Sequence, residues 1–272
     1  MNTVKAKWNV LYAIASVTYK EWAAYRTHSM VSILVGPISY LIQFSIWTAL
    51  YQDRTSLGGM TLENILSYSA VVATISYLTM DFADWNLQML IHTGKYLTFA
   101  LRPLHHRHFA LCQKIGHRVL GLIFEYIPVM LIFLFIFRVH LIPKNPFWAI
   151  LSIALAFLMN FYLNYCIGLA GFWFTKTSGL RGMIHLFSGV LSGAIIPLSI
   201  FPDIFQKIFF FLPFQFISYV PAMVYTGEYT LGGMTLSFPF IISIQAFYVF
   251  LMFLFSELLY RLGNRKFTGV GA

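Results

Sequence analysis

Six long apolar runs, nearly free of charged residues, constrain this chain more than any other feature of its sequence. They lie near residues 30–51, 62–81, 119–138, 148–174, 182–200 and 238–260. An α-helix rises about 1.5 Å per residue, so about 20 residues cross the roughly 30 Å of hydrocarbon in a bilayer. Only 10% of the residues are charged and 59% are hydrophobic, which a water-soluble fold could not cover with polar groups. We therefore predict an all-α polytopic membrane protein with six transmembrane helices.

The basic residues are distributed unevenly between the connections of these runs, and this predicts the orientation. Four of the 18 lysines and arginines lie on one side of the predicted membrane, namely Arg54, Arg138, Lys144 and Lys207. The others lie on the opposite side, which the positive-inside rule assigns to the cytoplasm. We therefore predict a multi-pass protein of the cytoplasmic membrane with both termini in the cytoplasm. Topology also accounts for the net charge of +9, so no nucleic-acid partner is expected.

Residues 4–27 are predicted to form an amphipathic elbow helix that lies on the membrane surface. Their apolar stripe recurs at steps of three and four residues and includes Trp8 and Trp22, while the basic residues lie elsewhere on the helical wheel. An apolar stripe with a basic opposite face is typical of an interfacial helix.

Residues 84–101 are predicted to form a second amphipathic helix, in the longest cytoplasmic loop. Asp84 is placed to cap a helix from Trp85 to about Ala100, and the Pro at position 103 ends it. Its apolar face consists of Leu87, Leu90, Ile91, Gly94, Leu97 and Leu101. An amphipathic helix on an internal loop is expected to bind either the headgroup layer or a protein partner.

Residues 200–225 are apolar enough to form a further span, but their prolines oppose it. Pro202, Pro213 and Pro221 divide the run into pieces of about 10 residues, each about 15 Å long as a helix, or half a bilayer. A seventh span would also place the basic C-terminal residues outside the cell. We predict two short re-entrant helices that enter from the outer face between spans five and six.

Polar and small residues inside the predicted spans are candidates for function or for helix packing. Glu125 is an intramembrane acid, for which a functional role and a pairing with Arg118 or with a neighbouring helix are both open. Gly189 and Gly193 form a GxxxG step in the fifth span, which indicates close helix packing. Further polar or small residues share a face in the first span (Gly36, Tyr40, Gln43, Trp47), in the fourth (Asn160, Asn164) and in the fifth (Ser188, Ser192).

Sequence motifs for catalysis are missing from the chain. No Walker A, GxSxG or HExxH pattern occurs. His105, His106 and His108 cluster in a basic loop without nearby Cys, Asp or Glu, so no metal site is predicted. We therefore expect no enzymatic activity in this chain, and no cofactor bound by it.

In the order of its parts, the chain resembles the membrane subunit of ABC exporters of the type 2 permease class. The segment IHTGKYLTFALRPL, residues 91–104, is similar to the sequence after the coupling helix in permeases related to viologen exporters. The segment SGAIIPLSIFPDIFQKIFFFLPFQFISYVPAMVYTG, residues 192–227, resembles the Gly- and Pro-punctuated outer motif of that class. The resemblance covers essentially the whole chain, residues 1–272, as a single permease domain.

This resemblance implies partners and site residues that composition alone does not show. Two permease subunits, identical or related, would pair above two ATPase subunits that hold ATP and Mg²⁺, and the complex would export a hydrophobic or amphipathic substrate through the membrane lipid. The implied ATPase-docking coupling helix comprises Asp84, Leu87, Leu90, Ile91, Gly94, Lys95, Leu97 and Leu101. The implied permease–permease interface comprises Gly36, Tyr40, Ser188, Gly189, Ser192 and Gly193. The implied translocation path comprises Gln43, Trp47, Asn160 and Asn164, and the implied outer gate comprises Pro197, Phe201, Pro202, Phe205, Pro213, Phe214 and Pro221.

Two other classes of protein stay open at this point. An integral membrane prenyl or acyl transferase would need a second acidic motif to bind magnesium together with Asp81 and Asp84. An ion channel or ion-coupled carrier would need charged rings or broken helices near the midplane, where Glu125 is the main candidate. Co-purification with an ATPase separates both classes from the exporter interpretation.

Overall fold

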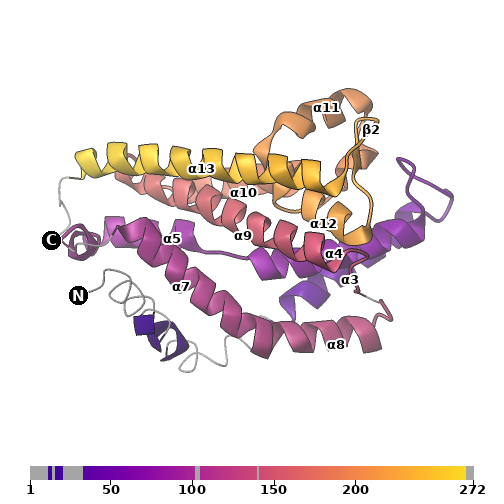
Figure 1. Cartoon of the computed structure of the whole chain (residues 1–272), viewed down its shortest axis with the longest axis horizontal. Helices are drawn as coiled ribbons and strands as arrows, with labels where there is room; N and C mark the ends of the chain where they lie inside the picture. Colours follow the sequence, from indigo (N-terminus) through magenta and orange to yellow (C-terminus); the bar gives the residue numbers. More distant parts are fainter. Residues whose placement is uncertain (1–11, 14–15, 21–32, 102–104, 140, 268–272) are drawn as a thin grey trace.

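Apolar helices make up most of the protein, as the apolar runs predicted (Figure 1). The computed structural model describes residues 12–13, 16–20, 33–101, 105–139 and 141–267, and 75% of it is helical. Most of the predicted elbow helix, residues 4–27, lies outside the described residues, so its placement stays a prediction. The all-α prediction needs one addition, a hairpin of β1 (Thr230–Leu231) and β2 (Met234–Thr235), in which Thr230 pairs with Thr235.

Helix α9 (Pro146–Leu169) is the centre of the bundle. It packs along α13 (Phe238–Lys266) and also contacts α4 (Leu62–Thr79) and α5 (Ala83–His92). A proline occupies the first turn of both α9 and α13, where its missing N–H would have no helical partner anyway. The side chains of Phe161 and Tyr165 on α9 are fully buried and stack on each other.

The helices differ in whether they are long enough to span the hydrocarbon of a bilayer. Within the described ranges, three helical segments are long and apolar enough: Leu62–His92, Pro146–Phe172 and Phe238–Lys266. The bent pair of α7 (His106–Gly121) and α8 (Ile127–Phe135) is a fourth candidate if it forms one span. The other two predicted spans correspond to α3 (Val35–Leu50) and α10 (Ser178–Leu191), of 16 and 14 residues. At about 1.5 Å per residue, α10 is about 21 Å long, so the count of six spans stays a prediction.

A proline accounts for the break between α7 and α8. A π-helical turn, η1 (Leu122–Tyr126), joins the two helices, which meet at an angle of 43°. Pro128 follows that turn and has no N–H to donate to the carbonyl of Phe124. A π-turn just before the proline accommodates the missing bond and bends the chain.

The predicted helix from Trp85 to Ala100 is two helices in the structure. Helix α5 ends at His92, and α6 (Leu97–Ala100) follows after a turn in which Gly94 has φ 71°. The left-handed conformation favours glycine, and it interrupts the predicted face, so Leu87 and Ile91 are buried while Leu97 and Leu101 are exposed. The helix start was also misplaced, because Phe82 and not Asp84 is the N-cap residue of α5.

Two short helices do occupy the segment 200–225. Helix α11 (Asp203–Phe211) and helix α12 (Tyr219–Thr226) are separated by the 3₁₀ turn η4 (Pro213–Phe216). Pro221 does not break the chain as expected, because it lies in the first turn of α12, where a proline costs no helical hydrogen bond. Gln206 of α11 holds this region together by donating to the carbonyls of Ser199 and Phe201 and accepting from the N–H of Gly232.

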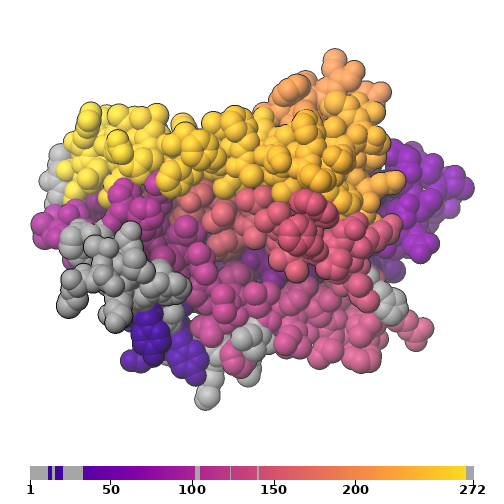
Figure 2. Space-filling model, viewed as in Figure 1, coloured from indigo at the N-terminus to yellow at the C-terminus, as the bar shows by residue number. Residues whose placement is uncertain are grey.

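The surface is apolar over wide areas. Figure 2 shows α13 as a continuous yellow band along one side of the molecule, with α11 projecting beyond it in orange. Phenylalanines on this helix are about half exposed, including Phe240, Phe247, Phe250 and Phe255. Such a surface is expected where lipid or another membrane subunit is the neighbour.

Candidate functional site

A cavity of about 480 Å³ lies between α3, α4 and the turn that follows α10. Small residues create the space, among them Gly36 and Ser39 on α3 and Ser69, Ala73 and Ser76 on α4. The remaining lining residues are Val35, Ile42, Gln43, Val72, Tyr77, Met80, Ala194 and Ile195. The lining therefore combines aliphatic side chains with hydroxyl and amide groups and contains no charged residue.

Only one of the four residues of the predicted translocation path lines this cavity. Gln43 does so, and its Nε2 donates to the carbonyl oxygen of Ile195 at 3.2 Å. Trp47 is 5% exposed and packs with Tyr51 and Ile65 in a separate cluster. The amide of Gln43 thus holds the turn after α10 against α3.

The two asparagines of α9 lie elsewhere in the bundle. The Nδ2 of Asn160 donates to the carbonyl oxygen of Thr79 at 2.7 Å, at the end of α4. Asn164 is 2% exposed, and within the described part of the chain its Oδ1 has no hydrogen-bond partner. Asn160 is therefore part of helix packing in this structure, and its place in a path stays a prediction.

A buried network of charged groups lies next to the end of the cavity that Tyr77 and Met80 line. Tyr77 lines the cavity, and its hydroxyl donates to the Oε2 of Glu125. Arg118 on α7 donates from Nη1 to the carbonyl of Tyr77 at 2.8 Å and from Nη2 to that of Met80 at 2.5 Å. Glu125 is 8% exposed, and Gly121 on the preceding turn leaves room for its carboxylate. The predicted pairing with a neighbouring helix is therefore present.

A second ion pair completes this network at the junction of α4 and α5. The Nζ of Lys114, one turn before Arg118 on α7, lies 3.2 Å from the Oδ1 of Asp81. The side chain of Asp81 has no exposed surface. Isolated buried charges are costly, whereas paired ones are tolerated. Asp81 therefore connects the junction of α4 and α5 to α7. Asp81 and Asp84, three residues apart, do not act as a pair, because Asp81 contacts Lys114 and Asp84 contacts His185.

Asp84 binds α10. Its Oδ2 lies 2.9 Å from the Nε2 of His185 and 3.7 Å from the Nε of Arg181, and Asp84 itself is 3% exposed. No residue of α10 is buried, so these polar contacts are important for holding that helix to the bundle.

The predicted permease–permease residues are used largely within the chain. Tyr40 is 2% exposed and packs against Phe133 and Phe137 near α8. The predicted GxxxG step is wrong as a helical motif, because α10 ends at Leu191 and Gly193 turns the chain with φ 79°. The carbonyl of Gly193 accepts a hydrogen bond of 2.8 Å from the hydroxyl of Tyr68.

The rest of that predicted interface is partly accessible. Ser188 and Gly189 are half-buried, whereas Ser192 is buried beside the turn. Gly36 is buried, and a Cβ built there would lie 3.9 Å from both Ala73 and Val129. Small residues therefore do mark close packing here, but the close neighbours come from the same chain.

The predicted docking residues divide into a buried and an exposed set. Leu87 and Ile91 on α5 are 1% and 6% exposed, since they face α9, and Leu90 packs partly against the same core. Lys95, Leu97 and Leu101 are exposed around α6. The face of α5 that is open instead carries Phe82, Trp85 and Met89.

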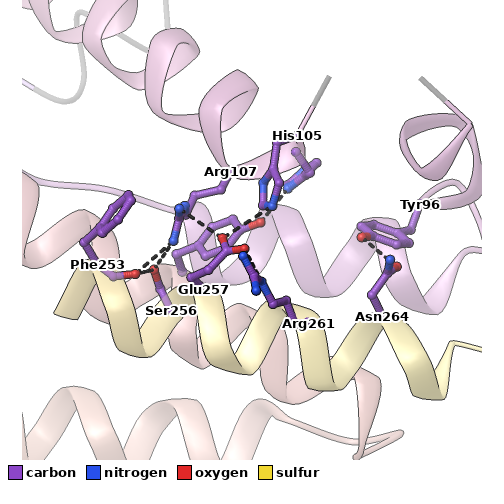
Figure 3. Close-up of polar contacts among 10 residues, drawn as sticks. Tyr96, His105, Arg107, Phe253, Ser256, Glu257, Arg261 and Asn264 are labelled. Atoms are coloured by element: carbon purple, nitrogen blue, oxygen red, sulfur yellow. Dashed lines mark hydrogen bonds and ion pairs between the residues drawn. The ribbon is translucent and has the colours of Figure 1, made fainter. Parts of the chain in front are cut away.

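A polar cluster that the sequence did not reveal anchors the start of α7 to α13 (Figure 3). Arg107 is 3% exposed, and its guanidinium donates to the carbonyl of Phe253 and to the hydroxyl of Ser256, both at 2.9 Å. Its Nη2 also lies 3.0 Å from the Oε2 of Glu257. Glu257 also pairs at 2.7 Å with Arg261, which lies four residues later on the same helix. Nothing local in the sequence pointed to Arg107, because its partners are about 150 residues away.

Two further residues belong to the same end of α13. The hydroxyl of Tyr96, which directly precedes α6, donates to the Oδ1 of Asn264 (Figure 3). His105 lies 3.4 Å from Glu257, but burial lowers the pKa of its imidazole more strongly than the carboxylate raises it. In the described ranges, no group of three or more His, Cys, Asp or Glu side chains is arranged to hold a metal ion.

The predicted outer-gate residues lie together around α11 and η4. The rings of Phe201 and Phe205 both contact that of Phe209, while Phe214 packs against the core and Pro197 is buried. Ile204, Phe205, Ile208 and Phe211 give α11 an exposed apolar face. A role in gating stays a prediction.

The apolar helices define the class of this protein, a multi-pass helical membrane protein. Residues 38–271 match the family described as ABC-2 family transporter protein. The chain therefore belongs to this family, and it is a permease of an ABC transporter, the membrane subunit that works with separate ATPase subunits. The chain matches none of the curated proteins and none of the solved structures with which it was compared. The predicted resemblance is confirmed at the level of the family, while the viologen-exporter subtype stays a prediction.

Proposed function

We propose that this permease exports an uncharged amphipathic molecule across the cytoplasmic membrane, and that the cavity between α3 and α4 is part of its path. The lining of the cavity is the observation that carries this proposal. It has hydroxyl and amide groups from Ser39, Gln43 and Ser76 among aliphatic side chains, and no charged residue. A charged solute would lose its hydration there without compensation, whereas an apolar molecule with one or two polar groups fits.

The partner ATPase is proposed to dock on the exposed part of the predicted coupling segment. Leu97 and Leu101 are 44% and 79% exposed, and Lys95 is exposed beside them. Tyr96 is fully buried and bonded to α13, so α6 projects from a firmly anchored base. Because Tyr96 fixes the start of α6 to α13, a displacement of α6 by the ATPase would also move α5 and α13.

A second permease is proposed to pack against α3 and α10. This chain covers both helices incompletely, and both expose large apolar residues, such as Ile38 and Leu41 on α3 and Met183 and Leu186 on α10. Packing between two copies or two related chains would cover these faces.

Reconstitution of the permease with its ATPase in lipid vesicles tests the proposed path. Uptake into inside-out vesicles is measured for a panel of neutral, cationic and anionic fluorescent amphiphiles, and neutral probes are expected to be transported. Ser39→Phe fills the cavity and should abolish that transport, while Ser243→Phe on α13 should not, because Ser243 is exposed, does not line the cavity and lies on neither α3 nor α10. Equal transport by both variants would contradict the proposed path.

A further inference from the structure

The chain between α4 and α5 leaves the helical conformation without a residue that would require it. The link Met80–Phe82 contains neither Gly nor Pro. Met80 has φ −54° and ψ 131°, and Phe82 has φ −124° and ψ 28°, so neither is helical. Figure 1 shows the link as a short extended connection between two helices that run in a similar direction, and the segment Leu62–His92 is apolar enough to be one span. Helices in membranes are broken in this way only where other groups satisfy the backbone.

Side chains from two other helices take over the hydrogen bonds that the break removes. In a continuous helix, the carbonyls of Tyr77, Thr79 and Met80 would accept from the N–H groups four residues later. In the structure, Arg118 of α7 donates to the carbonyls of Tyr77 and Met80, and Asn160 of α9 donates to that of Thr79. The Met80 N–H also contacts the Tyr77 carbonyl at 3.4 Å. The three carbonyls thus have side-chain donors that stand in for helical ones.

The ion pair next to these bonds holds the same link. Asp81 lies at the centre of the link with its side chain fully buried, and Lys114 of α7 pairs with it. Lys114 and Arg118 are four residues apart on one face of α7, so a single helix face supplies both the cation for Asp81 and two of the three carbonyl donors. The broken conformation of the link is therefore set by its contacts with α7 and α9 and not by a Gly or Pro of its own.

The link also lies between two places where motion would matter. Tyr77 and Met80 on its α4 side line the inner end of the cavity. On its other side, α5 leads through Gly94 into the exposed α6. A residue that passes from extended to helical shortens the chain by about 1.8 Å. Met80 is extended, so closing the link would draw α5 toward the cavity by about 2 Å, and about 5 Å is the limit for three extended residues.

We infer that Met80–Phe82 is a hinge with two states and that Arg118 is the residue that positions it. In one state the helix is broken and its carbonyls are bound by Arg118 and Asn160. In the other state α4 and α5 form one continuous helix, the carbonyls take helical N–H donors, and α5 has moved toward the cavity. The coupling of this movement to ATP rests on the proposed docking of an ATPase at α6, but the hinge itself does not. A partner that binds one state more tightly than the other shifts the population between them.

Distance measurements between two spin labels test the hinge on the full-length permease. The native Cys112 and Cys166 are replaced by Ser, and labels are attached at Asn64→Cys near the start of α4 and at Met89→Cys on α5, both of which are exposed. Pulsed electron paramagnetic resonance in lipid nanodiscs then reports the distance between the two labels. Arg118→Gln is expected to add a population shorter by up to about 5 Å, because it removes the donors of two carbonyls.

Two further variants keep the test decisive. Asn160→Leu removes the third donor with a side chain of the same branching and number of heavy atoms, and it should shift the distance in the same direction but less. Arg54→Gln, which changes an exposed arginine in the loop after α3, should leave the distance unchanged. Wild-type distances in both Arg118→Gln and Asn160→Leu would overturn the hinge. If Arg118→Gln does not accumulate in the membrane, Asn160→Leu decides alone in the same way.

Adding the partner ATPase and ATP separates the hinge from the proposed function. The wild-type complex is expected to populate the shorter distance in one nucleotide state and the longer one in another. If the variants shift the distance but nucleotide does not, the hinge stands and the proposed docking at α6 fails.

Discussion

Two helices of this protein end in the interior for different reasons. Helix α10 ends at Leu191 because Gly193 turns the chain in a left-handed conformation, with φ 79°. Helix α4 ends at Thr79 in a stretch without Gly or Pro, where Arg118 and Asn160 bind the freed carbonyls from positions 38 to 81 residues away. The first end is encoded by the residue at the turn, and the second by residues of other helices. We therefore expect the end of α10 to be fixed and the end of α4, which packing imposes, to be reversible.

The largest effect is expected at the locally encoded turn. Gly193→Ala forces a side chain into the left-handed region, and its Cβ would lie 2.9 Å from the hydroxyl of Tyr68. We expect a loss of about 3 kcal/mol in the free energy of unfolding, the upper end for backbone strain of this kind, measured by thermal unfolding of the purified protein in detergent. Gly182→Ala is the matched control, because it lies within α10 with nothing within 4 Å and should stabilise by about 0.5–1 kcal/mol. Equal stabilities of the two variants would show that Gly193 does not determine the turn.

A smaller loss is expected at the break held by packing. Arg118→Gln leaves two carbonyls without their guanidinium donor, and an unsatisfied buried carbonyl costs about 1–3 kcal/mol. Because α4 and α5 can recover helical bonds by joining, we expect a net loss of only about 2 kcal/mol, determined in the same thermal assay. Arg54→Gln should stay within about 0.5 kcal/mol of the wild type. A loss as large as that of Gly193→Ala would argue that the link cannot relax into a helix.

The smallest effect on stability is expected at α6, which follows the turn at Gly94. Leu97→Asp changes an exposed side chain, so the free energy of unfolding should stay within about 0.5 kcal/mol of wild type. Transport in vesicles should nevertheless stop, while the ATPase, no longer coupled to the permease, continues to hydrolyse ATP. Leu87→Asp, on the buried face of α5, should instead reduce the yield of folded protein. Wild-type transport by Leu97→Asp would place the docking surface elsewhere.

The success of sequence-based prediction differed between these regions for one physical reason. In a membrane, a helix face that meets lipid and a face that meets another helix are both apolar, so periodicity does not tell them apart. Leu87 and Leu97 were therefore assigned to one apolar face, although the first packs on α9 and the second is exposed. For the same reason Tyr40 was assigned to the interface with a second permease, although it is buried against Phe133 of the same chain.

For the polar residues of the predicted spans, the sequence indicated only some of the partners. Glu125 was expected to pair with Arg118 or a neighbouring helix, and Tyr77 of α4 is a partner. Asn160 was assigned to a path, and it donates to a helix end. The pair of Glu257 and Arg261 is of the kind that the sequence does indicate, because both of its members lie on one helix at i, i+4 and local spacing determines their contact.

The sequence by itself determined that this chain is a membrane protein, that residues 200–225 form short helices, and that it belongs to the family of ABC-2 transporters. These properties follow from hydropathy, from prolines and from motifs, all of which act over a few neighbouring residues. Only the tertiary structure decided which apolar faces are buried, where α4 breaks and which buried charges neutralise each other. Those outcomes depend on groups such as Arg118 and Arg107 meeting carbonyls and carboxylates far away in the chain, and a buried polar group finds its partner only when the helices that carry both are packed together.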